Sequence, residues 1–588
     1  MTSIVGTGGN DFIHVPGQGG TAPGFNDMPV ATDTGDTIDG AAGNDRILAG
    51  AGADTIAGGL GDDFVEGGAG DDLLLGGSGG DSLAGGAGID TVSYAASAAA
   101  VAIVVGEGSG SGGDAEGDTI AKSVETLIGS AFADTLQISD SIPGPVTIFT
   151  LEGGDGNDTL IVQNGGIFSS TPHSYLLKGG AGDDTLIGGY GQQTFIGGAG
   201  ADTIVGSPTG SAIGSNNTVS YADSQAGIRI NLSGGANGGA PGVGGDAQGD
   251  ILVRVGNAIG SAFDDVLTGN DGANRLQGGD GNDILQGRSG DPSSFTNGDL
   301  LDGGNGFDTS DYGDSTAAVH VDLVQGKGTG GTAQGDAYIS IEGISGSAFD
   351  DVVIGDNAAN TFWGLTGNDS LSGGGGSDSL RGGAGDDLLE GGAGADRFDG
   401  GDGIDTVTYI HSALGVTVDM GANSGRIGDA QGDTFAGVEN LVGSVRGDTL
   451  AGNSGANMLS GEDSNDRLTG AGGADVLNGG LGGDFFTYRA AGDSTVAVAG
   501  RDTIQDFNSL ENDKIDLSQI DADGNAGNGN GAFTFIETAA FTGVAGQVRF
   551  EAAGDDLLVQ ADTNGDKVAE FAILVQGAVT LTAADFVL

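Results

Sequence analysis

The segment GGLGDDFVEGGAGDDLLLGGSGGDSLAGGAGIDTVS, residues 58–93, is four consecutive copies of a nine-residue unit, Gly-Gly-x-Gly-x-Asp-x-apolar-x. Tandem short repeats of this kind indicate a parallel β-solenoid, in which each coil packs only on its neighbours. We expect the first six residues of a unit to turn and the last three to extend, so that two units complete one coil of about 18 residues. The predicted fold class is therefore all-β, a parallel β-roll or β-solenoid.

The apolar eighth residue of each unit predicts a narrow aliphatic core between two facing sheets. In the first array these residues are Ile47, Ile56, Val65, Leu74, Leu83 and Val92. The glycines are explained by turns whose backbone angles favour residues without a Cβ, and by the close approach of turns in adjacent coils.

The aspartate at position 6 of the unit should stack on the aspartate of the next coil, eighteen residues on. Stacked strands lie about 4.8 Å apart, so carboxylates and turn carbonyls can surround a hard cation at about 2.3–2.6 Å. Magnesium prefers a tight octahedron, and zinc and copper prefer nitrogen or sulfur, whereas this chain has four His and no Cys. We therefore predict several Ca²⁺ ions as cofactors, with these metal ligands: Asp45, Asp54, Asp63, Asp72, Asp81, Asp90, Asp158, Asp184, Asp202, Asp283, Asp308, Asp369, Asp378, Asp387, Asp396, Asp405, Asp466, Asp475 and Asp484.

Some units depart from this pattern at position 6. Gln193, Asn274, Asn360 and Asn457 replace the aspartate, and we expect these coils to bind calcium weakly or to cap a run of coils. The segment DTNGDKVAE, residues 562–570, begins like a calcium loop but lacks the glycine and glutamate of an EF-hand. An extra calcium site there stays open.

A longer repeat separates the arrays and occurs four times, leaving each array through a tyrosine and entering the next through GSAF or GSVR. Alternation such as that of residues 319–323 indicates strands with one buried face. Two interpretations stay open: wider coils that continue the same sheets, or separate small β modules. We predict an N-terminal segment with one degenerate repeat at 1–39, β-rolls at 40–93, 153–205, 269–309, 355–408 and 452–489, β-rich inserts at 94–152, 206–268, 310–354 and 409–451, and a β-rich C-terminal region at 490–588.

Composition restricts the partners. The 18 basic and 82 acidic residues give a net charge of -64, which repels nucleic acid and anionic lipid. That charge and 125 glycines predict a largely unfolded chain without metal. The longest apolar run of note, residues 98–105, is too short to cross a membrane, and residues 1–15 lack the features of a secretory signal peptide. We expect neither nucleic-acid binding nor membrane insertion.

The nonapeptides resemble those of RTX, or hemolysin-type calcium-binding, proteins over most of residues 40–487. The last hundred residues, including DTIQDFNSLENDKIDLSQID (502–521) and the ending Asp585-Phe586-Val587-Leu588, resemble the C-terminal region of serralysin-type secreted proteins. In that family the region carries an uncleaved type I secretion signal. The resemblance implies the type I secretion machinery as a partner and export from a Gram-negative bacterium to the medium or the cell surface. Cytosolic calcium is too scarce to load sites of extracellular strength, so we expect folding to follow export.

Sequence motifs for catalysis are missing, and we predict that the protein is not an enzyme, with no catalytic residues. A formal Gly-x-Ser-x-Gly at residues 76–80 lies inside a repeat turn and lacks the strand-to-helix elbow that activates serine. No histidine belongs to a His-Glu-x-x-His motif; the four are His14, His173, His320 and His411.

Three functions are compatible with this sequence. The first is a structural protein whose copies assemble into a surface layer or extracellular matrix, because nearly the whole chain is repeat and its composition resembles that of RTX surface-layer proteins. The second is a soluble, calcium-dependent adhesive module that binds a cell-surface glycan or a protein through the inserts, with contacts from Trp363, Tyr94, Tyr221, Tyr312 and Tyr409. The tyrosines are better explained as caps of each aliphatic core. The third is an enzyme hidden in the inserts or in residues 1–39.

Overall fold

The structure of the protein is a computed structural model. It describes residues 3–16, 23–28, 31–32, 34–139, 148–163, 173–189, 191–206, 216–288, 298–523 and 531–588. The chain forms two compact units, the first comprising Met1–Ser310 with Gly335–Ile341 and the second Asp311–Gln334 with Glu342–Leu588.

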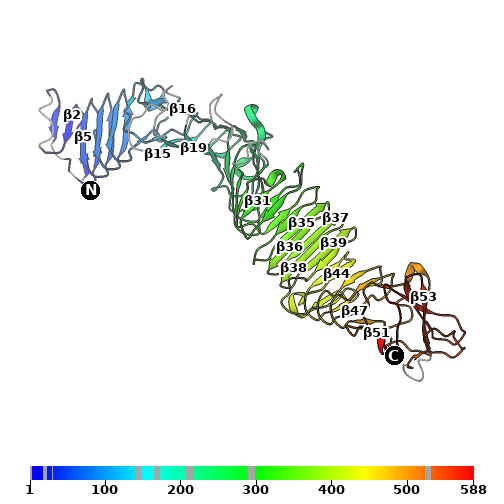
Figure 1. Ribbon diagram of the computed structural model, residues 1–588. Helices are drawn as coiled ribbons and strands as arrows, with labels where there is room; N and C mark the ends of the chain where they lie inside the picture. The colour runs from blue at the N-terminus through cyan, green and yellow to red at the C-terminus, as the bar shows by residue number, and fades with distance from the viewer. Residues whose placement is uncertain are drawn as a thin grey trace. The chain divides into compact units, whose positions relative to one another are not determined.

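The first unit is a parallel solenoid whose short strands stack coil on coil (Figure 1). One side begins with the sheet β3 (Asn26–Met28), β2 (Asp11–His14), β5 (Arg46–Ala51), β7 (Phe64–Ala69), β9 (Ser82–Ala87) and β12 (Thr119–Ile120). It continues with β11 (Ala102–Val105), β14 (Thr135–Ser139), β16 (Thr159–Gln163), β18 (Thr185–Ile187), β20 (Thr203–Val205) and β23 (Ile251–Val253), and then with β22 (Arg229–Asn231), β25 (Val266–Thr268), β27 (Ile284–Gln286) and β29 (Thr309–Asp311).

The facing sheet of the first unit runs along all of these coils. Its strands are β1 (Ser3–Val5), β4 (Thr37–Asp39), β6 (Thr55–Leu60), β8 (Leu73–Ser78), β10 (Thr91–Ser93), β13 (Thr126–Ile128), β15 (Ile148–Asp155), β17 (Ser174–Ala181), β19 (Gln192–Ala199), β21 (Thr218–Ser220), β24 (Asn257–Ile259), β26 (Arg275–Asp280), β28 (Leu300–Asn305) and β32 (Ala337–Ile339).

The second unit has the same architecture. One side carries β33 (Gly343–Ser345), β35 (Thr361–Thr366), β37 (Ser379–Ala384), β39 (Arg397–Asp402) and β43 (Thr434–Ala436), followed by β41 (Thr417–Asp419), β45 (Thr449–Ala451), β47 (Arg467–Thr469), β49 (Phe485–Thr487), β51 (Lys514–Asp516) and β56 (Phe586–Val587). The other side carries β30 (His320–Asp322), β34 (Val352–Ile354), β36 (Ser370–Gly375), β38 (Leu388–Ala393), β40 (Thr406–Thr408), β44 (Asn440–Val442), β46 (Met458–Ser460), β48 (Val476–Asn478), β50 (Thr503–Ile504) and β55 (Phe571–Val575).

The register of the repeats is eighteen residues, as predicted. Ile47 pairs with Val65, and Val65 with Leu83, in parallel strands. All three side chains are at most 1% exposed. The eighth residue of each unit therefore builds the aliphatic core, and the predicted all-β parallel β-roll is confirmed.

The inserts continue the same sheets, so the first of the two interpretations is confirmed. In the first insert β13 pairs in parallel with β10 before it and with β15 after it. Each insert also carries a short 3₁₀ turn: η1 (Gly113–Ala115), η3 (Gly245–Ala247), η4 (Gly331–Ala333) and η5 (Gly428–Ala430). Two inserts add an antiparallel strand to the wider coil, β31 (Lys327–Thr329) beside β30 and β42 (Ser424–Arg426) beside β41.

The C-terminal region closes on the last coils of the second unit. An antiparallel sheet of β53 (Gln547–Ala553), β54 (Asp556–Asp562) and β55 joins the solenoid because β55 pairs in parallel with β50. A short strand, β52 (Thr534–Phe535), pairs with β53. The final strand β56 pairs with β51 and places Phe586 beside Ile515.

Candidate calcium-binding turns

The position-6 aspartates form continuous ladders from coil to coil. In the first unit, the backbone N–H of Asp45 donates to Asp63 Oδ1 at 2.7 Å, and that of Asp63 donates to Asp81 Oδ1 at 2.8 Å. In the second unit, Asp369 donates in the same way to Asp387 at 2.8 Å, and Asp387 to Asp405 at 2.9 Å. Each carboxylate thus fixes the turn of the preceding coil through one oxygen.

All nineteen aspartates predicted as metal ligands are buried, with at most 3% of each residue exposed. In each of them Oδ1 accepts a backbone N–H from the preceding coil, as at Asp184, Asp283 and Asp475. The structure therefore brings these residues into ladders.

The second carboxylate oxygen distinguishes the repeat turns. Throughout the arrays Oδ2 is buried and accepts no hydrogen bond, for example at Asp63, Asp81, Asp202 and Asp387. A buried ionised oxygen without a donor is costly. Such a row of oxygens is the arrangement that a bound cation would stabilise.

A backbone carbonyl of a neighbouring coil faces the same space. A Cβ added to Gly58 would lie 2.5 Å from Asp63 Oδ2 and 2.5 Å from the carbonyl oxygen of Gly76 in the next coil. Gly364 has the same two kinds of neighbour, Asp369 Oδ2 and the Gly382 carbonyl. Because the glycine has no side chain, two hard oxygens converge beside it, and this donor chemistry fits Ca²⁺.

Burial and neighbouring charge raise the pKa of these carboxyls. Desolvation raises the pKa of Asp81 to about 7, and the charges of Asp118 and Asp63 add to the rise. Desolvation likewise raises the pKa of Asp202 to about 8 and that of Asp466 to about 8. Without a cation, ionising these residues at neutral pH opposes folding.

We predict that the calcium-free protein regains β structure on acidification. The folded-state pKa values of about 6 to 8 lie above the unfolded value of 3.8, so the stabilisation is complete below about pH 4 and is lost as the pH rises through 6 to 8. Circular dichroism of chelated protein from pH 8 to pH 4.5 should show this gain. Protons should also compete with calcium, so the stabilisation by calcium should shrink at low pH. A chelated protein that stays equally unfolded throughout would contradict the prediction.

A serine or threonine at position 2 of the unit donates hydrogen bonds to the position-6 aspartate. We call such an aspartate closed, and we call an aspartate open when its Oδ2 accepts no hydrogen bond. Ser444 donates its N–H to Asp448 Oδ2 at 2.6 Å and its hydroxyl to Asp448 Oδ1 at 3.0 Å. The same bonds occur at the starts of other arrays, in the pairs Ser130–Asp134, Ser261–Asp265 and Ser347–Asp351. In the repeat turns position 2 is instead a glycine with positive φ, such as +115° at Gly59, a conformation that serine reaches only with strain.

Tyrosine closes the aspartate of each insert for which a bond is resolved. The hydroxyl of Tyr94 donates to Asp118 Oδ2 at 2.7 Å, and that of Tyr409 donates to Asp433 Oδ2 at 2.8 Å. Tyr221 makes the equivalent bond to Asp250 at 2.8 Å. Tyr94, Tyr221, Tyr312 and Tyr409 are at most 2% exposed. The capping interpretation is confirmed, and these tyrosines are not surface contacts.

We predict that Tyr409→Phe destabilises the calcium-loaded protein by about 1–3 kcal/mol, because it leaves Asp433 Oδ2 buried without its donor. Ser444→Ala should have a smaller effect, since the backbone N–H of that turn still serves Asp448. Both are measured by urea unfolding at saturating calcium. An unchanged stability of Tyr409→Phe would show that the hydroxyl does not stabilise the insert.

Amides replace the carboxylates at array starts. The side-chain N–H of Asn457 donates to the Glu439 carbonyl at 2.9 Å, and that of Asn274 donates to the Gly256 carbonyl at 2.6 Å. Asn360 makes the equivalent bond to Glu342 at 3.3 Å. The side-chain N–H thus faces the preceding coil, whereas the amide oxygen lies beside the turn glycine and accepts the position-2 N–H, at 2.8 Å for both Asn274 and Asn457. The oxygen that would face a cation already has a donor, in agreement with a capping role.

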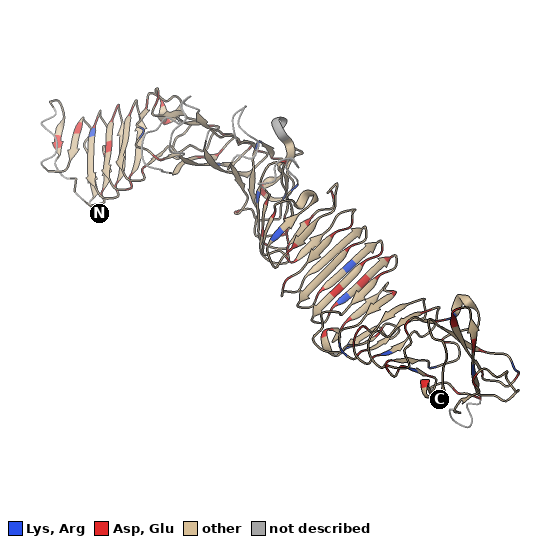
Figure 2. Cartoon of the chain, viewed as in Figure 1, with Lys and Arg blue, Asp and Glu red and all other residues tan. Residues whose placement is uncertain are grey.

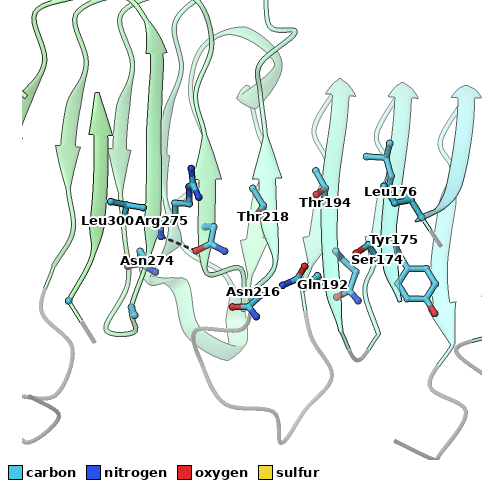
Figure 3. A pocket seen from close by; sticks show the side chains of 15 residues that line it. Ser174, Tyr175, Leu176, Gln192, Thr194, Asn216, Thr218, Asn274, Arg275 and Leu300 are labelled. Atoms are coloured by element: carbon cyan, nitrogen blue, oxygen red, sulfur yellow. Dashed lines mark hydrogen bonds between the residues drawn. The ribbon is translucent and has the colours of Figure 1, made fainter. Parts of the chain in front are cut away.

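Gln193 and Asn274, which replace the position-6 aspartate of their units, line a cavity of about 680 Å³ in the first unit. Figure 3 shows a row of side chains across its strands, and cross-strand register fixes their order as Leu176, Thr194, Thr218, Asn257, Arg275 and Leu300. Nine of the fifteen lining residues carry an amide or a hydroxyl, and none carries a carboxylate. Asn257 also accepts the Arg275 N–H at 2.9 Å.

Sequence reasoning missed the closed aspartates, which belong to the same ladders. Asp81 donates its N–H to Asp118 of the first insert at 2.7 Å, and Asp396 donates to Asp433 of the fourth at 2.8 Å. Two sequence patterns could have indicated these aspartates. GDAEGD and GDAQGD place an aspartate directly before the next strand. GSAFAD keeps the spacing of the nine-residue unit but lacks its second glycine.

The loop resembling a calcium site gathers three carboxylates. Asp562, Asp566 and Glu570 have oxygen atoms within 4.8 Å of one another. Asp562 Oδ1 already accepts the Gly565 N–H at 2.6 Å, and Glu570 Oε2 accepts the Thr563 N–H at 2.8 Å. Bonds of the loop itself therefore account for this arrangement.

Comparison with protein families agrees with this geometry. The RTX calcium-binding nonapeptide repeat (4 copies) matches residues 30–65, 58–92, 150–165, 176–207 and 259–292, and the serralysin C-terminal region of M10 peptidases matches residues 336–588. The chain therefore contains RTX calcium-binding nonapeptide repeats and a serralysin-type C-terminal region. No curated protein matches it.

Several properties follow from these matches. The protein binds calcium at multiple repeats, and it is exported by a type I system to the outside of the cell. The two matched regions are non-catalytic in their families. Among the residues that the structure describes, no helix has the length and apolar character to cross a bilayer.

Proposed function

We propose that this protein is a secreted structural protein that folds on calcium outside the cell and then self-assembles into a surface layer or matrix. The nineteen open aspartates of the repeat turns would hold the calcium ions. The single observation that carries the proposal is the extent of the solenoid, which fills both units from β1 to β51 and is built around ladders of buried carboxylates.

Charge supports assembly on calcium loading. The net charge of -64 makes copies repel one another and keeps the chain soluble. Nineteen divalent ions, one at each predicted aspartate, would offset thirty-eight of those charges. Calcium would therefore both fold the coils and lower the repulsion between folded copies.

An open edge supports assembly as well. Within the described residues, β3 pairs only with β2, and β1 pairs only with β4, so the first coil presents backbone groups on its outer side. Exposed edges of parallel sheets are templates for pairing with another chain. The first coil is therefore the proposed contact between copies.

A calcium titration of the metal-free protein tests the proposal, followed by light scattering and by electron microscopy at each step. Sheets or filaments should form at millimolar calcium and dissolve in chelator. Val5→Lys, at an edge residue 61% exposed, should weaken assembly, whereas Leu60→Lys, at a residue 60% exposed inside the array, should not. A monodisperse particle at every calcium concentration would refute self-assembly.

The second candidate is a soluble adhesive module. It is favoured by one observation, a hollow beside Trp363 on the surface of the second unit. The hollow is compatible with either function, since a structural protein also needs attachment.

A further inference from the structure

The chain has one tryptophan, Trp363, and it lines a hollow of about 460 Å³ in the second unit. The other lining side chains are Leu365, Arg381, Ala384 and Asp402, and two glycines complete the floor. The hollow lies at the ends of β35, β37 and β39, where the strands pass into repeat turns. Trp363 is half-buried, and the indole ring forms part of the wall of the hollow.

Cross-strand register places polar partners next to the tryptophan. Trp363 is opposite Arg381, and Arg381 is opposite Asp399, on the solvent-facing side of the sheet. Arg381 Nε lies 3.7 Å from Asp399 Oδ2, and these side chains are 61% and 31% exposed. Figure 2 shows basic and acidic positions close together on the strands of this part of the chain. The face therefore offers an apolar ring, a donor and an acceptor in one row.

Leu365 breaks the repeat at this place. It occupies position 2 of its unit, where the neighbouring units have Gly383 and Gly401, and it keeps the positive φ of those glycines at 78°. Such a conformation strains a residue with a Cβ. The side chain is also 41% exposed, so burial does not compensate the strain. An apolar group beside the tryptophan is thus kept at a cost to the fold.

We propose that this hollow binds a neutral pyranose unit of a polysaccharide. The tryptophan and leucine would pack on the apolar C–H face of the sugar, while Arg381 would donate to its hydroxyls and Asp399 and Asp402 would accept from them. A polyanion is disfavoured by the two carboxylates and by the net charge of -64. A concave, small hollow suits a small unit better than a protein surface does. This inference is independent of self-assembly.

The position of the lone tryptophan gives a direct measurement. Its fluorescence is recorded in the calcium-loaded full-length protein during titration with cellohexaose, maltohexaose and mannohexaose, with an alginate oligomer as the anionic comparison. A saturable blue shift with at least one neutral oligosaccharide, and none with alginate, is expected. The absence of a shift with all three neutral probes would overturn the proposal.

Calorimetry of substituted proteins tests whether the oligosaccharide binds in this hollow. Trp363→Ala should weaken binding at least 10-fold, and Trp363→Tyr should retain part of it. Leu365→Gly restores the repeat consensus, so it should weaken binding several-fold without lowering the melting temperature. Leu388→Ala, at a residue 44% exposed on another strand of the same unit, should change neither. If Trp363→Ala instead abolishes association between copies and leaves sugar binding intact, the hollow is a contact between copies and the proposal is wrong.

Discussion

Removal of calcium from the folded protein should convert it into an expanded chain with little β structure. The ladders place many carboxyl oxygens in the interior without donors, and the sequence adds a net charge of -64 with no disulfide to oppose it. Small-angle scattering in chelator should give a radius of gyration approaching about 90 Å, the scale of an unfolded chain of this length. Circular dichroism should lose its β signal in parallel.

The specificity of this transition is also predicted. Returning millimolar calcium should restore the compact state. The same concentration of magnesium should not, because Mg²⁺ retains its bound water molecules and requires a tight octahedral set of ligands. Sodium chloride at matched ionic strength controls for screening of the charge. A protein that stays compact and β-rich in chelator at pH 8 would show that the ladders fold without metal.

Asp387→Asn should produce a large loss of calcium-dependent stability. The amide still offers an acceptor to the Asp369 N–H, but the substitution removes the charge of a buried carboxylate whose Oδ2 has no donor. We expect a loss of about 2–3 kcal/mol of calcium-dependent stability and a higher calcium midpoint for folding. Urea unfolding at fixed calcium and calcium titration by circular dichroism measure the two quantities.

The neighbouring residue provides a matched control. Asp386 is exposed, and its Oδ1 accepts the Ile404 N–H at 2.9 Å. Asp386→Asn removes the same charge and keeps the acceptor, so stability should change by less than about 0.5 kcal/mol. Equal effects of the two substitutions would mean that net charge, and not the buried oxygen, couples calcium to folding.

The fold could be predicted from the sequence because the repeat fixes both the period and the inward position. Val65 and Leu83 follow from the eighth position of the unit, and Asp63 and Asp81 from the sixth. In the inserts, buried positions can be assigned from the sequence only where apolar and polar residues alternate. The insert strands continue the same sheets because β13 pairs with both β10 and β15. Irregular segments separate these three strands in the sequence, so their pairing could not be predicted from a repeat period.

The division between open and closed aspartates was not predictable from residue type. Asp81 and Asp118 are neighbours in one ladder, yet Tyr94, distant in sequence from Asp118, donates to only the second of them. Asp448 differs from Asp466 through a serine four residues earlier, whose N–H and hydroxyl both reach the carboxylate. Such differences arise from the backbone angle at position 2 and from side chains of other coils. The nine-residue repeat pattern alone therefore does not distinguish open from closed aspartates.

The most direct test is a structure of the calcium-loaded protein with anomalous scattering to locate the ions. The account predicts ion density beside the aspartates of the glycine turns, such as Asp63, Asp81 and Asp387, and none beside the tyrosine-bound Asp118 and Asp433 or the serine-bound Asp448. Ions distributed equally over open and closed aspartates, or absent from the glycine turns, would contradict it.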